Sequence, residues 1–489
     1  MQPTVRVVAA TAALVVLASC GLRTGKEQVH AATQAALGSG TAGLSAGSSP
    51  GGASGTAASG QAGGESSALP SGGAAAVGGS TPGAASGGAA TGGAASAASP
   101  AITAPPGGNG GPTDVGVTGD TISVGNVSDL GGPVPGLFQG GPYGTQAYFD
   151  YVNTQGGVYG RKLKLVTADD QLTCSQNEAD YQNLVNKVFA FVGSWSLDDN
   201  CGAQILAQHK DIPVLNQALS VQAESLPNAY NVAPYGAGAP LGWFQYYKQK
   251  YPDAIGAVGT IVGNQPAAVQ GWQYSKATMQ SIGYKVIYED DFPPAQSNFT
   301  ADVIRMRSAG VKMVYIVSVN APDLAAFSQE ANQQGWHPEV FASAIGYFGS
   351  YVAEAGGPAN VENQYMNIGQ AMFLGEDAST VPEVALFDQW MHSAFASFPI
   401  DQFSATSWAN AALFVEALKA AGPKLTRAGL LQALANIHTY NDHGMEAPID
   451  VASKQPSNCY LLLQVHGGKY VKVDDPATGF RCDAPYFHV

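Results

Sequence analysis

The side chains of this sequence that could support catalysis or metal binding do not form a familiar catalytic set. His438, Asp442 and His443 lie close together and could be metal ligands. Their spacing is not the i, i+4 pair of a helical metal site, and the residues around Asp442 are typical of a turn. The folded part also has no Ser/His/Asp set, zinc-protease motif or phosphate-binding loop that we recognise. We therefore expect a protein that is not an enzyme and holds no metal and no cofactor.

Polar side chains instead follow two predicted strands. An apolar run from Ile122 to Val127 ends at Ser128 and Asp129, and a second run from Leu163 ends at Asp169-Asp170. A loop rich in glycine and proline and an aromatic helix lie between the two runs. This pattern predicts a β–loop–α–β unit. In a doubly wound sheet, ligands bind at the carboxyl ends of the strands, where these polar residues fall.

Two short motifs within this unit carry a resemblance. Residues 156–163 are G-G-V-Y-G-R-K-L, and residues 168–171 are A-D-D-Q. This stretch resembles the type 1 periplasmic binding proteins, in particular the branched-chain amino-acid and amide receptors of ABC importers. The alternative is a generic Rossmann-like unit with a glycine turn. The resemblance implies an α/β fold of two Rossmann-like lobes, joined by a multi-strand hinge with a ligand cleft between them.

The rest of the chain alternates helix and strand patterns, which favours parallel sheets covered by helices. By the resemblance we assign residues 113–234 and 370–445 to lobe 1, and residues 235–369 and 446–489 to lobe 2. Within the returning part, residues 380–383 match a capping box, and a helix is predicted from Ser407 to Ala421. The alternation of apolar and polar residues after Asn458 is typical of edge strands.

The N-terminal segment is predicted to export and anchor the protein. Residues 1–20 have a basic start and an apolar core too short to span a bilayer. They end in Leu-Ala-Ser-Cys20, which resembles a bacterial lipobox and implies a lipid on Cys20. The alternative is an ordinary secretory signal with a chance cysteine. Residues 21–112, rich in Gly, Ala and Ser, should be a disordered tether. We expect the protein on the outer face of the cytoplasmic membrane.

The lipidated Cys20 leaves four further cysteines. A disulfide is the default interpretation in an exported protein, and we expect a bridge between Cys174 and Cys201. The resemblance supports this bridge, since several receptors of the family carry one at this place. We expect a second bridge, Cys459 to Cys482, to close the C-terminal tail. A metal site is the alternative for the first pair, but no CxxC or nearby histidine pair accompanies it.

The composition excludes one class of partner. The net charge is −14 and only 12% of residues are charged, and no basic cluster is present. Such a chain is poorly suited to nucleic acid.

Candidate ligand-binding residues follow from the resemblance by position. In the family, loops of the first lobe hold the ligand's carboxylate or an equivalent group. The matching positions here are Leu137, Phe138, Gln139, Ser194, Trp195, Ser196, Ala218 and Ser220.

The second lobe departs from the family pattern. Amino-acid receptors usually place aromatic residues and an acid there, which meet the α-ammonium group. The corresponding loops here offer Asn264, Gln265, Asn320 and Tyr347, with no acid at the expected place. A buried unpaired ammonium is costly, so we expect a neutral polar, amide-like or aromatic ligand rather than a standard amino acid.

These observations predict a monomeric solute-binding lipoprotein. It would capture a small-molecule ligand and deliver it to an ABC permease, with its lipid in the membrane. One alternative is a sensor subunit that works with a membrane partner. Another is a wall-associated scaffold that binds no ligand.

Overall fold

The computed structural model describes residues 102–489, except 295, 297, 318 and 474–478. All described elements belong to the contact unit that spans residues 92–489. The predictions for residues 1–20, for the lipid on Cys20 and for residues 21–101 of the tether lie outside the described residues. Among the described residues, no helix combines the length and the apolar character needed to cross a membrane.

The first sheet contains four parallel strands in the order β2-β1-β3-β4. Their bounds are β1 (Thr121–Ser128), β2 (Lys162–Asp169), β3 (Ala190–Val192) and β4 (Val214–Leu215). The strands β1 and β2 confirm the predicted β–loop–α–β unit, with α2 (Gly140–Thr154) between them. Ile122 and Val124 are fully buried, as an apolar strand run requires.

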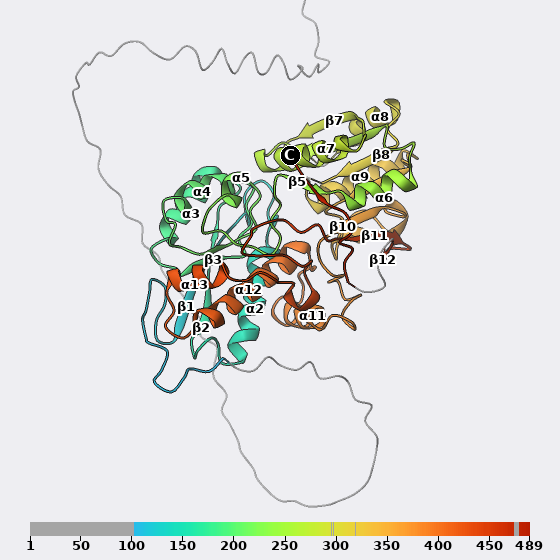
Figure 1. Ribbon diagram of the computed structural model, residues 1–489. Helices are drawn as coiled ribbons and strands as arrows, with labels where there is room; N and C mark the ends of the chain where they lie inside the picture. Colours follow the sequence, from blue (N-terminus) through green and yellow to red (C-terminus); the bar gives the residue numbers. More distant parts are fainter. Residues whose placement is uncertain (1–101, 295, 297, 318, 474–478) are drawn as a thin grey trace, which may run out of the picture. The chain divides into compact units, whose positions relative to one another are not determined.

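Helices from both ends of the chain cover this sheet. The early helices are α3 (Cys174–Leu184), α4 (Asp199–Leu206) and α5 (Val221–Glu224). The late helices are α11 (Pro382–Ala394), α12 (Gln402–Ala421) and α13 (Arg427–Leu434). Helices α2 and α12 lie side by side, although they are far apart in the sequence (Figure 1). The chain therefore returns to the first lobe after it has formed most of the second.

The second sheet contains seven strands in the order β12-β11-β10-β9-β8-β6-β7. Its strands are β6 (Val258–Gly263), β7 (Val286–Phe292), β8 (Met313–Ile316), β9 (Val340–Ser343), β10 (Tyr365–Ile368), β11 (Leu461–His466) and β12 (Lys469–Lys472). The five from β6 to β10 are parallel, and β11 and β12 add an antiparallel edge. The accompanying helices are α6 (Gly242–Lys250), α7 (Pro266–Ser281), α8 (Thr300–Ser308), α9 (Ala321–Gln333) and α10 (Tyr351–Glu354).

Short elements complete the fold. Strands β5 (Gly238–Pro240) and β13 (Tyr486–His488) form an antiparallel pair, and two 3-10 turns lie at Pro358–Asn360 and Asp442–Gly444. The two sheets confirm the α/β class with two lobes. The strands of each sheet fall inside the ranges assigned to each lobe, and the exact lobe boundaries stay a prediction.

Three local predictions differ from the structure. The Thr380 hydroxyl donates to the Asp377 carbonyl and caps no helix, because α11 begins after Val381. Helix α12 begins at Gln402 rather than Ser407, since Asp401 and Ser404 form a capping box there. Strand β11 is not an edge strand, because β12 folds back on it and covers that side.

The predicted tether also ends earlier than residue 112. Tyr159 N–H donates to the Ile102 carbonyl at 2.7 Å, and the Arg161 guanidinium donates to the carbonyls of Asn109 and Gly111. Residues 102–112 are therefore hydrogen-bonded to the folded part of the chain. They are held by a buried arginine that needs acceptors for its N–H groups.

Candidate ligand-binding cavity

A cavity with a volume of about 360 Å³ is lined by residues of both lobes. In the first lobe, the lining comes from the loops that follow the four strands of the first sheet. In the second lobe, it comes from the carboxyl ends of β6 to β10 and the loops after them. The cavity thus occupies the position at which open α/β sheets bind ligands.

Aromatic side chains form one wall of this cavity. Phe138, Trp195 and Phe403 pack together, with ring centroids 4.8 Å to 5.6 Å apart. The indole N–H of Trp195 donates to the Ser407 hydroxyl on α12 at 2.9 Å. This bond fixes the indole and leaves its apolar surface to the cavity.

Three acids, Glu224, Asp323 and Glu446, are the charged residues among the lining residues that the structure describes. Burial raises the pKa of Asp323 to about 7. Burial also raises the pKa of Glu224 and of Glu446, the latter well above its usual value. No lysine, arginine or histidine belongs to the described lining. The cavity therefore offers no cation to a ligand carboxylate, and it favours the neutral form of its own acids.

Several buried acceptor atoms in the lining have no hydrogen-bond partner within the described chain. They are Oε1 of Gln217, Oδ1 of Asn367 and Oε1 of Glu446, and one buried donor of the same lining, the indole N–H of Trp243, is also unpaired. Buried acceptors of this kind are costly when they stay unpaired. The cavity therefore suits a ligand that brings N–H or O–H donors together with an apolar body.

Some residues predicted from the sequence line this cavity. They are Leu137, Phe138, Trp195, Ser220, Gln265 and Asn320. Two of them also cap helices. The Ser220 hydroxyl accepts from the Ala223 N–H at 3.2 Å, and the Asn320 side chain accepts from the Asp323 N–H at 2.8 Å.

Ser194, Ser196 and Ala218 lie elsewhere. They line a separate cavity of about 20 Å³, enough space for roughly one water. The Ser194 hydroxyl accepts from the Val127 N–H at 3.0 Å, and the Ser196 hydroxyl lies 3.4 Å from a carboxylate oxygen of Asp129. These serines tie strand ends together, so the predicted carboxylate-binding loops turn their hydroxyls inward.

Gln139, Asn264 and Tyr347 are also absent from the lining of the large cavity. Gln139 stands at the N-terminus of α2, and Asn264 is exposed to solvent. The hydroxyl of Tyr347 donates to Glu376 at 2.6 Å, and its ring packs against Phe373 and Tyr470 in the core. The structure thus gives Tyr347 a packing role.

The acids of the cavity were missed by sequence reasoning, which looked for an acid only in the third loop of the second lobe. Asp323 lies three residues after the predicted Asn320, and Gln217 directly precedes the predicted Ala218. These two residues could have been found if the candidate ranges had included a few more positions on each side of the predicted loops. Glu224 and Glu446 give no local signal, because the fold brings them to the cavity from a short helix and from a crossover between the lobes.

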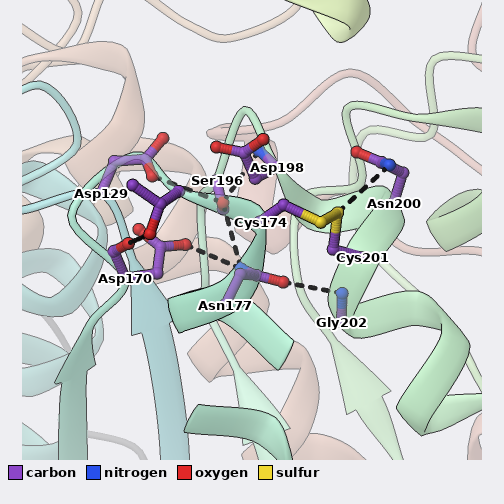
Figure 2. The surroundings of a disulfide bond; sticks show 10 residues. Asp129, Asp170, Cys174, Asn177, Ser196, Asp198, Asn200, Cys201 and Gly202 are labelled. Atoms are coloured by element: carbon purple, nitrogen blue, oxygen red, sulfur yellow. Dashed lines mark hydrogen bonds between the residues drawn. A yellow bond between two sulfur atoms is a disulfide. The ribbon is translucent and has the colours of Figure 1, made fainter. Parts of the chain in front are cut away.

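The predicted Cys174–Cys201 disulfide is confirmed, with a Cα–Cα distance of 5.4 Å (Figure 2). It joins the first residue of α3 to α4. Asn177 reinforces this link, since its amide donates to Asp170 at 2.7 Å and its oxygen accepts from the Gly202 N–H at 2.8 Å. The Cys459–Cys482 disulfide is also confirmed, with a Cα–Cα distance of 4.1 Å.

Two carboxyls lie beside this link at the ends of β1 and β2, as Figure 2 shows. Burial, followed by the hydrogen bond and charge of Asp170, raises the pKa of Asp129 from 3.8 to about 10. One oxygen of Asp129 accepts from the Leu197 N–H at 2.8 Å. The polar strand ends predicted from the sequence are therefore mainly a structural network that holds the loops of the cavity.

Comparison with known proteins identifies the family. The profile of the periplasmic binding protein family matches residues 121–469. A Leu/Ile/Val-binding protein homolog 7 of Brucella melitensis biotype 1 is 22% identical over 368 residues, 72% of this chain and 91% of that protein. The homolog of Brucella abortus (strain 2308) is 22% identical over 309 residues, 61% of this chain and 76% of that protein.

Solved structures share the fold at low identity. A fatty acid ABC transporter substrate-binding protein from Thermomonospora curvata has a TM-score of 0.64 at 19% identity, over 78% of this chain and 96% of that chain. A branched chain amino acid ABC transporter from Thermus thermophilus, with bound valine, has a TM-score of 0.62 at 17% identity, over 74% and 97%. The chain therefore belongs to the periplasmic binding protein family, with the type 1 fold of these structures, and members of this family bind small solutes outside the cytoplasmic membrane.

Proposed function

We propose that this protein is a lipid-anchored solute receptor of an ABC importer, and that its ligand is a mostly apolar, neutral molecule with N–H or O–H donors. The observation that carries the proposal is the composition of the 360 Å³ cavity, which joins an aromatic wall to acids and unpaired acceptors and lacks any cation among its described lining residues. A monomer tethered through Cys20 would close on the ligand and present it to the permease. The protein would perform no catalysis.

The cavity changes the reason for excluding standard amino acids. The sequence suggested that nothing would meet an α-ammonium group, yet Glu224, Asp323 and Glu446 line the cavity and could meet one. The α-carboxylate is the group without a charged partner, because no described lining residue is a cation and the predicted Ser194 and Ser196 face another cavity. A ligand carboxylate would also be buried without a cation among the described lining residues, which disfavours its binding.

The names of the relatives supply the competing ligand classes. Two relatives are named as Leu/Ile/Val-binding homologs, and one solved structure is named as a fatty acid receptor. Both classes carry a carboxylate at neutral pH. A neutral ligand with a branched or aromatic apolar part would use the same apolar wall and would not need the missing partner.

A thermal-shift screen of the full chain in detergent tests this function. The panel contains branched-chain amino acids, fatty acids, primary amides, alcohols and small aromatic compounds. A ligand at a hundred times its dissociation constant stabilises the fold by about 2.7 kcal/mol, which gives a clear shift. We expect hits among the neutral compounds. Hits confined to amino acids or fatty acids would overturn the ligand class, and silence across the panel would favour a scaffold that binds no ligand.

Two adjacent residues give a matched pair of variants for any hit. Gln265 lines the cavity, whereas Asn264 is exposed and lies outside it. We expect Gln265→Ala to weaken binding about 10-fold, the effect of one lost hydrogen bond of roughly 1.4 kcal/mol, and Asn264→Ala to leave it unchanged. Equal effects of both variants would place the ligand outside this cavity.

A further inference from the structure

Glu383, Asp442 and His443 come together near the N-terminal end of α11, and none of the three lines the large cavity. One potential ligand atom from each residue lies within 4.8 Å of the other two. The Nδ1 atom of His443 is 3.6 Å from Oε2 of Glu383 and 4.0 Å from Oδ1 of Asp442. Glu383 and Asp442 are buried, whereas the His443 side chain is 68% exposed.

Each of the two carboxylates has one oxygen held by a buried donor. The indole N–H of Trp408 donates to Oε1 of Glu383 at 2.8 Å, and the single proton of the Tyr440 hydroxyl is shared between Oδ1 of Asp442 at 3.3 Å and the Ala409 carbonyl at 3.1 Å. These bonds orient both carboxylates, so that Oε2 of Glu383 faces Nδ1 of His443, and Oδ2 of Asp442 is left without a partner in the described chain. Donors of this kind commonly fix the ligands of a metal ion.

The second oxygen of Asp442 is the independent sign of a missing partner. Asp442 is 1% exposed, and its Oδ2 atom has no hydrogen-bond partner within the described chain. A buried carboxylate oxygen without a partner is costly, and a cation is one of the groups that removes this cost.

We propose that Glu383, Asp442 and His443 bind a divalent transition-metal ion of the Zn²⁺ class. Two carboxylates and one imidazole form a donor set typical of zinc, and the exposed side of His443 leaves a fourth position for water. Calcium and magnesium prefer oxygen donors alone, so the imidazole selects against them.

The site would fasten α11 to a segment that joins the lobes. Residues 442–444 form a 3-10 turn, and Glu446, two residues after it, pairs with Gln370 in an antiparallel bridge. The N–H of Ala371 donates to the Met445 carbonyl, and the N–H of Ala447 donates to the Gly369 carbonyl. A bound ion would therefore brace the crossover next to the cavity without touching the ligand.

Metal binding by the full chain tests the proposal. The protein is treated with a chelator, dialysed and titrated with ZnCl₂ by calorimetry, and its melting temperature is measured with and without Zn²⁺. We expect one ion per chain and a higher melting temperature. Absence of saturable binding, or equal binding of Ca²⁺ or Mg²⁺, would overturn the proposal.

His438 provides a matched control. Its side chain is also 68% exposed, and its Nδ1 lies 3.3 Å from a carboxylate oxygen of Asp450, outside the proposed site. We expect His443→Ala to weaken Zn²⁺ binding at least about 10-fold and His438→Ala to leave it unchanged. Glu383→Gln, which keeps the shape of the side chain, should weaken it as His443→Ala does. Equal losses in the two histidine variants would show adventitious surface binding instead.

Discussion

Asp129 illustrates how a residue chosen for its chemistry can turn out to be structural. It follows β1, at the strand end where ligands usually bind, yet it is fully buried and shares its surroundings with Asp170 and Asp198. Its oxygens accept from the Leu197 N–H and from the Ser196 hydroxyl. Burial keeps this carboxyl protonated in the folded state, and its effect should be seen in the pH dependence of stability.

We predict that Asp129→Asn flattens that pH dependence. Below pH 3.8 the Asp129 carboxyl is protonated in both states and contributes nothing to the change. Above that pH it ionises only in the unfolded chain, so stability should fall by up to about 1.4 kcal/mol per pH unit until the folded pKa is reached. An asparagine keeps the shape without this loss.

Melting temperatures at pH 5, 7 and 9 measure the effect. The melting temperature of Asp129→Asn should rise relative to that of the unmodified chain as the pH increases. Asp120→Asn is the control, because Asp120 is exposed. This variant should show the same fall of melting temperature with rising pH as the unmodified chain. If the melting temperatures of Asp129→Asn and of the unmodified chain change equally with pH, Asp129 is not protonated in the folded state.

Arg161 explains part of the family signature at the level of one side chain. It is fully buried and donates to the carbonyls of Thr118, Pro423, Asn109 and Gly111. A planar guanidinium can reach these acceptors at once, whereas an ammonium group cannot. The arginine of the signature therefore stabilises the first lobe by joining these segments through hydrogen bonds.

We predict that Arg161→Lys lowers the free energy of unfolding by about 2–4 kcal/mol, since several charge-assisted hydrogen bonds are lost. Urea unfolding measures this change. Lys164→Arg, at an exposed position of the adjoining strand β2, should change the free energy of unfolding by less than about 0.5 kcal/mol. A loss for Arg161→Lys no larger than for the control would show that the lysine finds equivalent partners.

At the scale of elements, the β1–α2–β2 unit was predictable because its signals are local. Apolar runs mark the strands, and Gly157 marks the turn, where a Cβ atom would lie 2.0 Å from the Arg161 carbonyl oxygen. The start of α12 was missed because the sequence search began at its apolar stretch, whereas the capping box at Asp401 sets the helix start. The direction of the Ser194 and Ser196 side chains was not predictable, because it depends on strands that pair far along the chain.

The disulfide between α3 and α4 is the element-scale feature with the clearest energetic consequence. It joins residues 27 apart in the sequence, and the loop-entropy model assigns such a bridge about 3.5 kcal/mol. We predict that the double variant Cys174→Ser with Cys201→Ser loses about this amount while the fold persists. Asn177 should keep the two helices together through its bonds to Asp170 and Gly202.

Urea unfolding with and without a reductant checks this prediction. In the unmodified chain both disulfides are reduced, whereas in the variant only Cys459–Cys482 remains to be reduced. The reductant lowers the free energy of unfolding in both proteins. The amount lost by the unmodified chain minus the amount lost by the variant therefore reports the Cys174–Cys201 bridge alone. An unfolded double variant, or a difference near zero, would contradict the stabilising role that we assign to this bridge beside the Asn177 network.

At the scale of the whole molecule, the fold was predictable through the resemblance, whereas most of the cavity was not. Both lobes contribute to the cavity, and its acids reach it from segments as distant in sequence as Glu224 and Glu446. Spacing along the chain carries no information about such long-range neighbours. The aromatic Phe138 and Trp195 were found because they fall in loops that follow strands of the first sheet, as the family pattern implies.

The central claim is that this cavity selects a neutral, mostly apolar ligand over a carboxylate. Its most direct test is calorimetric titration of the full chain at pH 7.5 with matched pairs of a primary amide and the corresponding acid, such as isovaleramide with isovalerate and benzamide with benzoate. We predict that the amide of at least one pair binds more than about 10-fold tighter than its acid, because no described lining residue offers a cation to the carboxylate. Equal or tighter binding of the acid would contradict the claim and would favour the ligand classes named for the relatives.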